Sequence, residues 1–235
     1  MSDVEAMVFD WGGTLSVWAQ VDYQNLWRDA ARGLAPDEEE TLVAQLIEAE
    51  RKFWTQVQDS QVSSSLQKVI AAATQEMGLD VTEALLTSAV EHHLGAWSDH
   101  VVHDPDAAPV LKELRGRGLK LGLLSNTLWP GAHHEHLLER DGLRDLIDAR
   151  MYTSDMEHTK PHPEAFWQVL EALGVRDAGR AVFVGDRPFD DIYGAKRAGL
   201  RAVLRPNPYT PAFDVEPDAV IHDLRSLLGV LAGWT

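Results

Sequence analysis

Short apolar runs that end in Asp, Ser or Gly recur along the chain, and they constrain its fold more than any other feature. Residues 6–9 form such a run, ended by Asp10, which is typical of a strand buried on both faces of a parallel sheet. Helical patterns followed by glycine alternate with these runs. The alternation predicts a doubly wound parallel α/β sheet, similar to a Rossmann fold, with right-handed crossovers. Further strands are expected at 119–124, 149–152, 181–184, 201–204 and 219–221, and helices at 106–115, 163–173 and 190–198.

One long segment interrupts the alternation. Roughly a hundred residues separate the first run from the next clear strand, far more than a crossover needs. An apolar helical face spans 37–57. Ser64 with Gln67 forms a capping-box pattern that opens a helix closing at Gly78, and Thr82 is expected to start another.

These helices predict two domains. We expect an α/β core made of residues 1–16 and 99–235, and an all-helical cap made of residues 17–98, inserted after the first strand and seated over the loop that follows it.

Composition narrows the choice of partners. A net charge of −16 over 235 residues disfavours nucleic acid and anionic membrane, because both need a basic surface. The chain has no cysteine, which excludes disulfides and thiolate chemistry.

The acidic first residues lack the basic start and apolar stretch of a signal peptide, and no apolar run is long enough to span a membrane. A cytoplasmic protein is expected. The sequence does not indicate an oligomeric state.

Polar residues suited to phosphate chemistry follow four of the expected strands. Asp10 follows the first, Ser125 the second, Lys160 the third, and Asp186 the fourth. Ligands of open α/β sheets bind at the carboxyl ends of the strands, so these side chains are expected to share one site.

The chemistry of such a site can be built from these residues. A carboxylate can attack phosphorus and form an aspartyl-phosphate. Two carboxylates facing an anionic substrate need a hard divalent cation between them, and Mg²⁺ with its oxygen ligands suits. Asp10 and Asp186 can supply that site, while a hydroxyl, backbone N–H groups and a lysine neutralise the phosphoryl oxygens.

The same residues carry a family resemblance. The chain resembles the haloacid dehalogenase-like (HAD) hydrolase superfamily, and the helical insert lies where that family places its C1 cap. Four motifs carry the resemblance, in order: Phe9-Asp10-Trp11-Gly12-Gly13-Thr14-Leu15; Leu124-Ser125-Asn126; Lys160-Pro161-His162-Pro163; and Val184-Gly185-Asp186 with Asp190-Asp191-Ile192-Tyr193-Gly194-Ala195.

The resemblance implies a Mg²⁺-dependent phosphatase that acts on a small phosphorylated metabolite. It implies Asp10 as the nucleophile, Ser125 as a phosphate ligand and Lys160 as the group that neutralises charge. Mg²⁺ would bind Asp10, Asp186 and the main-chain carbonyl of Gly12, with Asp191 nearby. The implied phosphate- and substrate-binding residues are Trp11, Gly12, Gly13, Thr14, Ser125, Asn126 and Lys160.

Gly12 departs from the family pattern. Most of the family's phosphatases read Asp-x-Asp-Gly-Thr, and the second Asp transfers protons to the leaving group and from water. Glycine cannot transfer a proton, so acid–base catalysis worth about 10²–10⁴-fold is missing from its usual place. A cap residue could replace it, and Glu50, His92 and His93 are candidates by location.

Two alternative functions remain open on these residues. The phosphonoacetaldehyde hydrolases of the family carry a very similar Asp-Trp-Ala-Gly-Thr run and use a cap lysine, for which Lys52 could serve; Lys68 is the other lysine of the insert. Gly12 also fits a catalytically impaired protein that binds phosphate or has a regulatory role. Dehalogenase activity is disfavoured because Gly185-Asp186 is the metal-binding form of the fourth motif.

Other residues near the motifs have less specific interpretations. Trp11, Trp18 and Trp129 could line a substrate pocket or simply pack. Asp190 is expected to cap its helix. His133, His134 and His136 have poor spacing for a zinc site, so they are expected at the exposed start of a helix.

Overall fold

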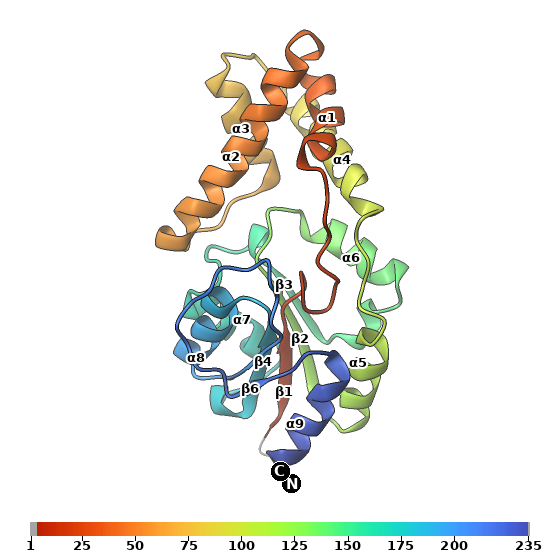
Figure 1. The fold of residues 1–235 in the computed structure, drawn as a ribbon, viewed down its shortest axis with the longest axis vertical. Coiled ribbons are helices and arrows are strands. Elements are labelled where there is room, and N and C mark those ends of the chain that lie inside the picture. The colour runs from red at the N-terminus through yellow and green to blue at the C-terminus, as the bar shows by residue number, and fades with distance from the viewer. Residues whose placement is uncertain (1–3, 235) are drawn as a thin grey trace.

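The computed structural model describes residues 4–234, and a six-stranded parallel sheet lies at its centre (Figure 1). The strand order is β3-β2-β1-β4-β5-β6, so the predicted doubly wound α/β fold is confirmed. β2 and β3 lie on one side of β1, and β4, β5 and β6 lie on the other. The order of strand addition therefore switches sides between β1 and β4, which is where such folds bind ligands. The strands are β1 (Ala6–Phe9), β2 (Lys120–Ser125), β3 (Ala149–Tyr152), β4 (Ala181–Gly185), β5 (Arg201–Leu204) and β6 (Ala219–Val220).

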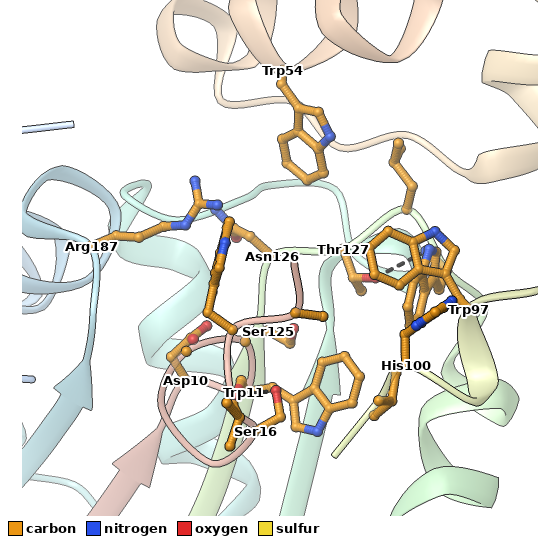
Figure 2. Close-up of a pocket in the computed structure, with 18 of the residues that line it drawn as sticks. Asp10, Trp11, Ser16, Trp54, Trp97, His100, Ser125, Asn126, Thr127 and Arg187 are labelled. Atoms are coloured by element: carbon orange, nitrogen blue, oxygen red, sulfur yellow. Dashed lines mark hydrogen bonds between the residues drawn. The ribbon is translucent and has the colours of Figure 1, made fainter. Parts of the chain in front are cut away.

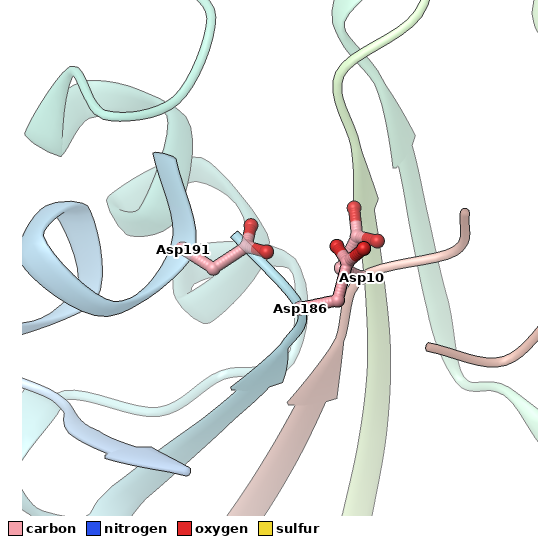
Figure 3. Close-up of side chains that lie close together, drawn as sticks. All are labelled: Asp10, Asp186 and Asp191. Atoms are coloured by element: carbon pink, nitrogen blue, oxygen red, sulfur yellow. The ribbon is translucent and has the colours of Figure 1, made fainter. Parts of the chain in front are cut away.

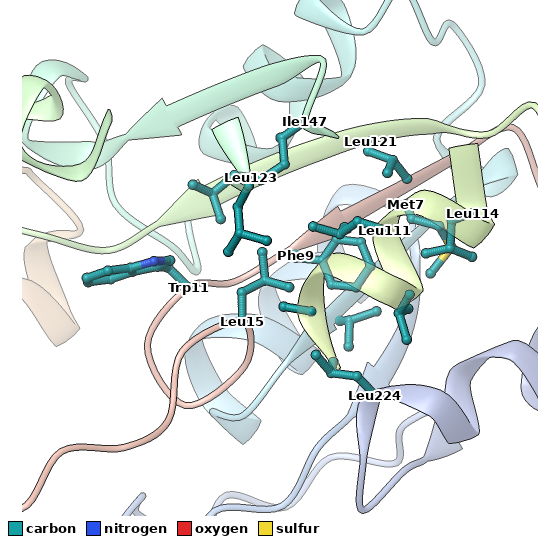
Figure 4. Close-up of a cluster of buried hydrophobic side chains, with 14 of the residues drawn as sticks. Met7, Phe9, Trp11, Leu15, Leu111, Leu114, Leu121, Leu123, Ile147 and Leu224 are labelled. Atoms are coloured by element: carbon teal, nitrogen blue, oxygen red, sulfur yellow. The ribbon is translucent and has the colours of Figure 1, made fainter. Parts of the chain in front are cut away.

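Helices cover both faces of the sheet because the buried strands are apolar on both sides. Met7 and Phe9 of β1 belong to one hydrophobic cluster, while Ala6 and Val8 belong to the other. Figure 4 shows part of the first cluster, in which Phe9 packs near Leu111 and Leu123. That face is covered by α5 (Ala107–Gly116), α6 (Gly131–Arg140) and α9 (Leu227–Gly233), and the opposite face by α7 (Pro163–Ala172) and α8 (Gly194–Ala198).

The residues between the first two strands form the helical layer beyond the carboxyl ends of the strands (Figure 1). Its helices pack around another hydrophobic cluster, in which Trp27, Leu46 and Ile70 are fully buried and which Leu128, after β2, also joins. They are α1 (Tyr23–Leu34), α2 (Glu39–Ser60), α3 (Leu66–Glu76) and α4 (Glu83–Ser98). The all-helical insert is therefore present, and the domain boundaries at 16/17 and 98/99 stay a prediction.

Local details of the helix starts differ in part from expectation. Thr82 caps α4 as predicted, accepting a hydrogen bond from the backbone N–H of Leu85. The cap of α3 is Ser65 rather than Ser64, and it accepts from the backbone N–H of Lys68. Neighbouring serines have equal capping ability, so the pattern alone misplaced this start by one residue.

The described part of the chain contains no helix long and apolar enough to cross a bilayer. The expectation for the acidic start of the chain falls largely on residues 1–3, which lie outside the described residues. Single helical turns complete the fold at Pro36–Glu38, Arg144–Leu146, Thr153–Asp155, Ala178–Arg180, Pro188–Tyr193 and Leu224–Ser226.

Candidate active site

Three polar side chains meet at the ends of neighbouring strands. β1 pairs with both β2 and β4, and Phe9 lies in register with Leu123 on one side and Val184 on the other. The backbone N–H of Asp10 continues this pairing with a 2.9 Å hydrogen bond to the carbonyl of Val184. Parallel pairing therefore places Asp10 beside Ser125, the last residue of β2, and beside Asp186, which directly follows β4 (Figures 2 and 3).

Lys160 joins this group from a loop and bridges two carboxylates. Its side chain is buried, and Nζ lies 2.7 Å from Oδ1 of Asp10 and 2.7 Å from Oδ1 of Asp191. Burial alone lowers the pKa of Lys160, but the two adjacent carboxylates outweigh it and raise the pKa above its ordinary value. The ammonium therefore stays charged and points at the end of β1.

Asn126 fixes the backbone of Lys160. Its side-chain amide donates to the carbonyl of Lys160 and its side-chain oxygen accepts from the backbone N–H of Lys160, both at 2.9 Å. This two-point contact links the end of β2 to the loop before α7, so that the lysine side chain starts from a defined position. Asn126 also lines the cavity above Asp10.

Asp10, Asp186 and Asp191 bring carboxylate oxygens within 4.8 Å of one another, and all three side chains are buried (Figure 3). Burial raises the pKa of Asp10 to about 6, with Lys160 opposing the rise. Burial together with the charges of Asp10 and Asp191 raises the pKa of Asp186 to about 8. Such mutually repelling carboxylates gain from a cation placed between them.

An unpartnered oxygen supports the same conclusion. Oδ2 of Asp186 accepts a 2.6 Å hydrogen bond from Nδ2 of Asn207, whereas Oδ1 is buried without any hydrogen-bond partner. Buried polar atoms are rarely left unpaired unless an ion or water completes them. Oxygen-only ligands suit Mg²⁺, so these carboxylates fit the implied metal.

The glycine loop after Asp10 has two different glycines. Gly13 has a φ of +83°, and a Cβ there would lie 2.3 Å from Oδ2 of Asp186, so only glycine fits beside this carboxylate. Gly12 differs, because a Cβ added to it would meet no atom within 4 Å. The position that carries an Asp in most related phosphatases is thus open space, and the surrounding chain does not require a glycine there.

A cavity of about 200 Å³ lies above this loop, between the sheet and the helical insert (Figure 2). Asp10 and Ser125 lie at its floor, Trp54 of α2 at its top and Arg187 at its side. Trp11, Trp18 and Trp129 all line it, and Trp11 and Trp129 also pack against the hydrophobic cluster on one face of the sheet.

Trp11 is held by a chain of hydrogen bonds that the sequence pattern did not indicate. Its indole N–H donates to Nε2 of His103 at 3.0 Å, and Nδ1 of His103 donates to Oδ2 of Asp141 at 2.6 Å. His134 packs edge-on against the Trp11 ring, with the centroids 4.5 Å apart. These contacts fix the wall of the cavity next to the candidate nucleophile. They join residues that are distant in the chain, since Trp11 and His103 are 92 positions apart and His103 and Asp141 are 38 positions apart.

The candidate residues of the cap have different positions. Glu50 lines the cavity. His92 is exposed, and His93 is buried against Trp27, with ring centroids 3.6 Å apart. The expectation that Lys52 could reach the site is wrong in this structure, because Nζ lies 3.3 Å from a carboxylate oxygen of Glu76 on an exposed surface of the cap. Lys68 is exposed as well.

Two further expectations need correction. Asp190 does not cap a helix; its carboxylate lies 3.5 Å from the guanidinium of Arg187, and the turn at Pro188–Tyr193 has no side-chain cap. His134 is not exposed, because it is buried and hydrogen-bonds Thr127 Oγ1 at 2.9 Å. Asp191 accepts from the backbone N–H of Arg187 and bridges to Lys160, which explains why it points inward.

Sequence reasoning missed Arg187 and Asn207. Arg187 follows Asp186 directly, so its place beside a strand-end carboxylate could have drawn notice. Asn207 lies 21 residues beyond its partner Asp186, after β5, and no local pattern marks it.

Comparisons with known proteins agree with this geometry. A family model described as haloacid dehalogenase-like hydrolase matches residues 4–199. Phosphatase MT3486 of Mycobacterium tuberculosis (strain CDC 1551 / Oshkosh) is 38% identical over 130 residues, which are 55% of this chain and 56% of the relative, so the chain spans little more than half of that protein.

Solved structures match over almost the whole chain, among them a 2-haloacid dehalogenase and a HAD phosphatase. The 2-haloacid dehalogenase of Pseudomonas syringae pv. Tomato DC3000 is 30% identical with a TM-score of 0.74, covering 99% of this chain and 100% of that one. A HAD phosphatase of Thermococcus onnurineus is 25% identical with a TM-score of 0.66, covering 98% and 99%. With its strand-end carboxylates, buried lysine and matching family model, the chain belongs to the haloacid dehalogenase-like hydrolase family.

Proposed function

We propose that this hydrolase is a Mg²⁺-dependent phosphatase that acts on a small phosphorylated metabolite through an aspartyl-phosphate at Asp10. The observation that carries the proposal is the surroundings of Asp10. Its carboxylate is buried at the floor of a cavity, held by Lys160, and lies next to Asp186, which keeps one oxygen unpartnered. Relatives named as phosphatases add support.

The first step is an in-line attack of a carboxylate oxygen of Asp10 on phosphorus. A phosphorus–oxygen bond forms at Asp10 while the bond to the leaving alcohol breaks. Lys160 holds Oδ1 of Asp10, which leaves the other oxygen free to attack. The ammonium of Lys160 and the hydroxyl of Ser125 offset charge on the transferring phosphoryl group.

In the second step, water attacks the phosphorus of the aspartyl-phosphate, which releases inorganic phosphate and restores Asp10. Mg²⁺, when held by Asp10, Asp186 and the carbonyl of Gly12 with Asp191 nearby, would supply positive charge against the phosphoryl oxygens. No side chain at Gly12 transfers the protons of either step, so substrates with good leaving groups should react fastest.

Two other functions have less support. Phosphonoacetaldehyde hydrolysis would need a lysine above Asp10, whereas Lys52 pairs with Glu76 on the surface. A haloacid dehalogenase needs no metal, and the buried group of Asp10, Asp186 and Asp191 would then be three repelling carboxylates with one lysine between them.

The test is an activity panel. Purified protein with Mg²⁺ is given acetyl phosphate, p-nitrophenyl phosphate, phosphonoacetaldehyde and 2-chloropropionate, in parallel with an Asp10→Asn variant and with a sample treated with EDTA. We expect release of phosphate from acetyl phosphate that is lost in both controls, and a mass increase of one phosphoryl group on Asp10 in rapidly quenched samples.

Three results would overturn the proposal. Release of chloride from 2-chloropropionate without metal would identify a dehalogenase. Turnover of phosphonoacetaldehyde that is lost in Lys52→Arg would identify a C–P bond hydrolase. Binding of inorganic phosphate without turnover of any substrate would identify an impaired, phosphate-binding protein.

A further inference from the structure

Five tryptophans and one tyrosine are among the residues that line the cavity above Asp10. Trp11 and Trp129 lie 5.9 Å apart between ring centroids, and Trp97 follows at 5.3 Å from Trp129. Tyr23 then lies 6.0 Å from Trp97, so the four rings form a continuous wall contributed by both domains. Trp54 lies at the top of the cavity (Figure 2).

A single carboxyl group of the cap lines this aromatic cavity. Glu50 lies four residues after Leu46 and four before Trp54 on α2, and so on the same inward-facing stripe of that helix. Within residues 4–234, no lysine, arginine or histidine nitrogen lies within 4 Å of its carboxylate oxygens, whereas Glu48 on the same helix pairs with Arg51 at 2.6 Å. An inward-facing carboxyl without a cation is costly to leave charged, so the position calls for a partner.

The surrounding groups reflect the same lack of a counter-ion. Burial raises the pKa of Glu50, and the indole N–H groups of Trp54 and Trp27 offset only part of the rise. After burial, the charge of Glu50 is the main cause of the raised pKa of Tyr23, which places that phenol close to the carboxyl.

The one arginine that lines the cavity has other partners. The guanidinium of Arg187 lies 3.5 Å from Asp190 and 5.8 Å from the ring of Trp18. The positive charge that Glu50 lacks would therefore have to come with the ligand.

We propose that the cavity binds the phosphate monoester of an amino alcohol, with the phosphate at Asp10 and the cationic ammonium group between the aromatic rings and Glu50. Aromatic faces attract ammonium ions. Quaternary ammonium groups suit such a site best, because they lose little hydration when rings surround them. The inference rests on the phosphatase function proposed above. A cavity of about 200 Å³ is below the usual range for drug-sized ligands, which agrees with a substrate of a few carbon atoms.

The decisive comparison uses two substrates of the same shape. Phosphocholine and 3,3-dimethylbutyl phosphate differ only in a charged nitrogen against a neutral carbon. We expect kcat/KM to favour phosphocholine by about 30-fold, the size expected of a desolvated cation–π contact. Equal kcat/KM values for the two esters would overturn the inference.

Variants test the role of Glu50. Glu50→Gln keeps a neutral hydrogen-bonding group and removes the charge, so the preference for phosphocholine should fall to about threefold or less. Glu48→Gln, on the same helix and outside the cavity, should keep the full preference. Trp54→Leu removes one aromatic ring and leaves Glu50 in place, so it should also reduce the preference for phosphocholine. A preference that persists unchanged in both Glu50→Gln and Trp54→Leu would contradict the assignment.

Binding separates this inference from the phosphatase proposal. Five tryptophans line the cavity, so choline alone should quench indole fluorescence, more strongly in the wild-type protein than in Glu50→Gln. Choline binding without Asp10-dependent release of phosphate would refute the phosphatase and keep the cation site. Release of phosphate from acetyl phosphate, with no choline binding and no discrimination between the two esters, would refute the cation site alone.

Discussion

The ammonium of Lys160 lies 2.7 Å from a carboxylate oxygen of Asp10, and both side chains are buried. The same ammonium lies 2.7 Å from Asp191. One positive charge therefore serves two buried carboxylates, and Asp186 adds a third beside them, so a bound cation would offset the excess negative charge.

Replacing Lys160 with Met should weaken both folding and catalysis. The variant keeps an apolar chain of similar length but leaves Asp10 and Asp191 without their shared cation, so the free energy of unfolding should fall by about 3 kcal/mol in EDTA. Mg²⁺ should restore part of this loss. Phosphatase kcat should fall by about 10²–10³-fold, as for loss of one group that stabilises transition-state charge.

Urea denaturation with and without Mg²⁺ measures the first effect, and Lys112→Met on the exposed face of α5 is the control. Equal stability of Lys160→Met and Lys112→Met in EDTA would show that the buried ion pairs contribute nothing net.

Gly12→Asp should raise activity on alkyl phosphates. A side chain at this position meets open space, and its carboxyl would supply the missing proton transfer, worth at least about tenfold in kcat. Acetyl phosphate, with its good leaving group, should gain little in the first step. Gly12→Asn has the same shape and no acid, and so serves as the control. If Gly12→Asp stays folded, binds Mg²⁺ and gains nothing over Gly12→Asn, our account of Gly12 is wrong.

Asn126 should act through Lys160 rather than on phosphate directly. Asn126→Ala removes both 2.9 Å hydrogen bonds to the Lys160 backbone and should lower kcat by about tenfold, roughly one lost interaction in the transition state. In a Lys160→Met background the same change should cost little, because coupled residues are not additive. A full tenfold loss in that background would instead indicate a direct contact with substrate.

His134 should make the protein less stable at mildly acidic pH. Burial lowers the pKa of His134 to about 3, and its Nδ1 is buried without a partner, so the folded state keeps the ring neutral. In the unfolded chain this histidine binds a proton near pH 6.5. The contribution of the neutral, buried ring to the free energy of unfolding is therefore complete above pH 6.5 and is lost as pH falls from there towards 3. Between pH 7.5 and 5 the loss should be about 2 kcal/mol.

Urea denaturation at these two pH values, compared between the wild type and His134→Gln, isolates the effect. The variant should lose about 2 kcal/mol less than the wild type over this range. His92→Gln, at an exposed position, should follow the wild type. Identical pH dependence in wild type and His134→Gln would argue against a neutral buried ring.

The sheet could be predicted from the sequence because its signals are local. The apolar run at 6–9, ended by Asp10, needs only burial on both faces to become a strand, and parallel pairing then brings Asp10, Ser125 and Asp186 to one edge. Lys160 was found as a motif residue, but its two ion pairs depend on side chains 150 and 31 positions away.

The errors arose where tertiary contacts override local preference. Asp190 follows a helix-start pattern, yet Arg187 attracts its carboxylate. His134 has the polar neighbours of an exposed helix start, yet it stacks on Tyr152 with ring centroids 4.7 Å apart. His103 is the partner of Trp11, and Asn207 is the partner of Asp186. Both pairings depend on how loops converge, and no spacing rule encodes that.

The hydrogen bonds from Trp11 through His103 to Asp141 have a consequence for how this enzyme could change its substrate. Trp11 is joined to Asp10 by one peptide bond, so the ring that lines the cavity and the carboxylate that we propose as the nucleophile share one piece of backbone. Altering that wall would disturb the reacting group as well. New specificity would then be acquired more easily through Glu50, Trp54 and Trp97. These residues belong to the insert, so they can vary without displacing Asp10.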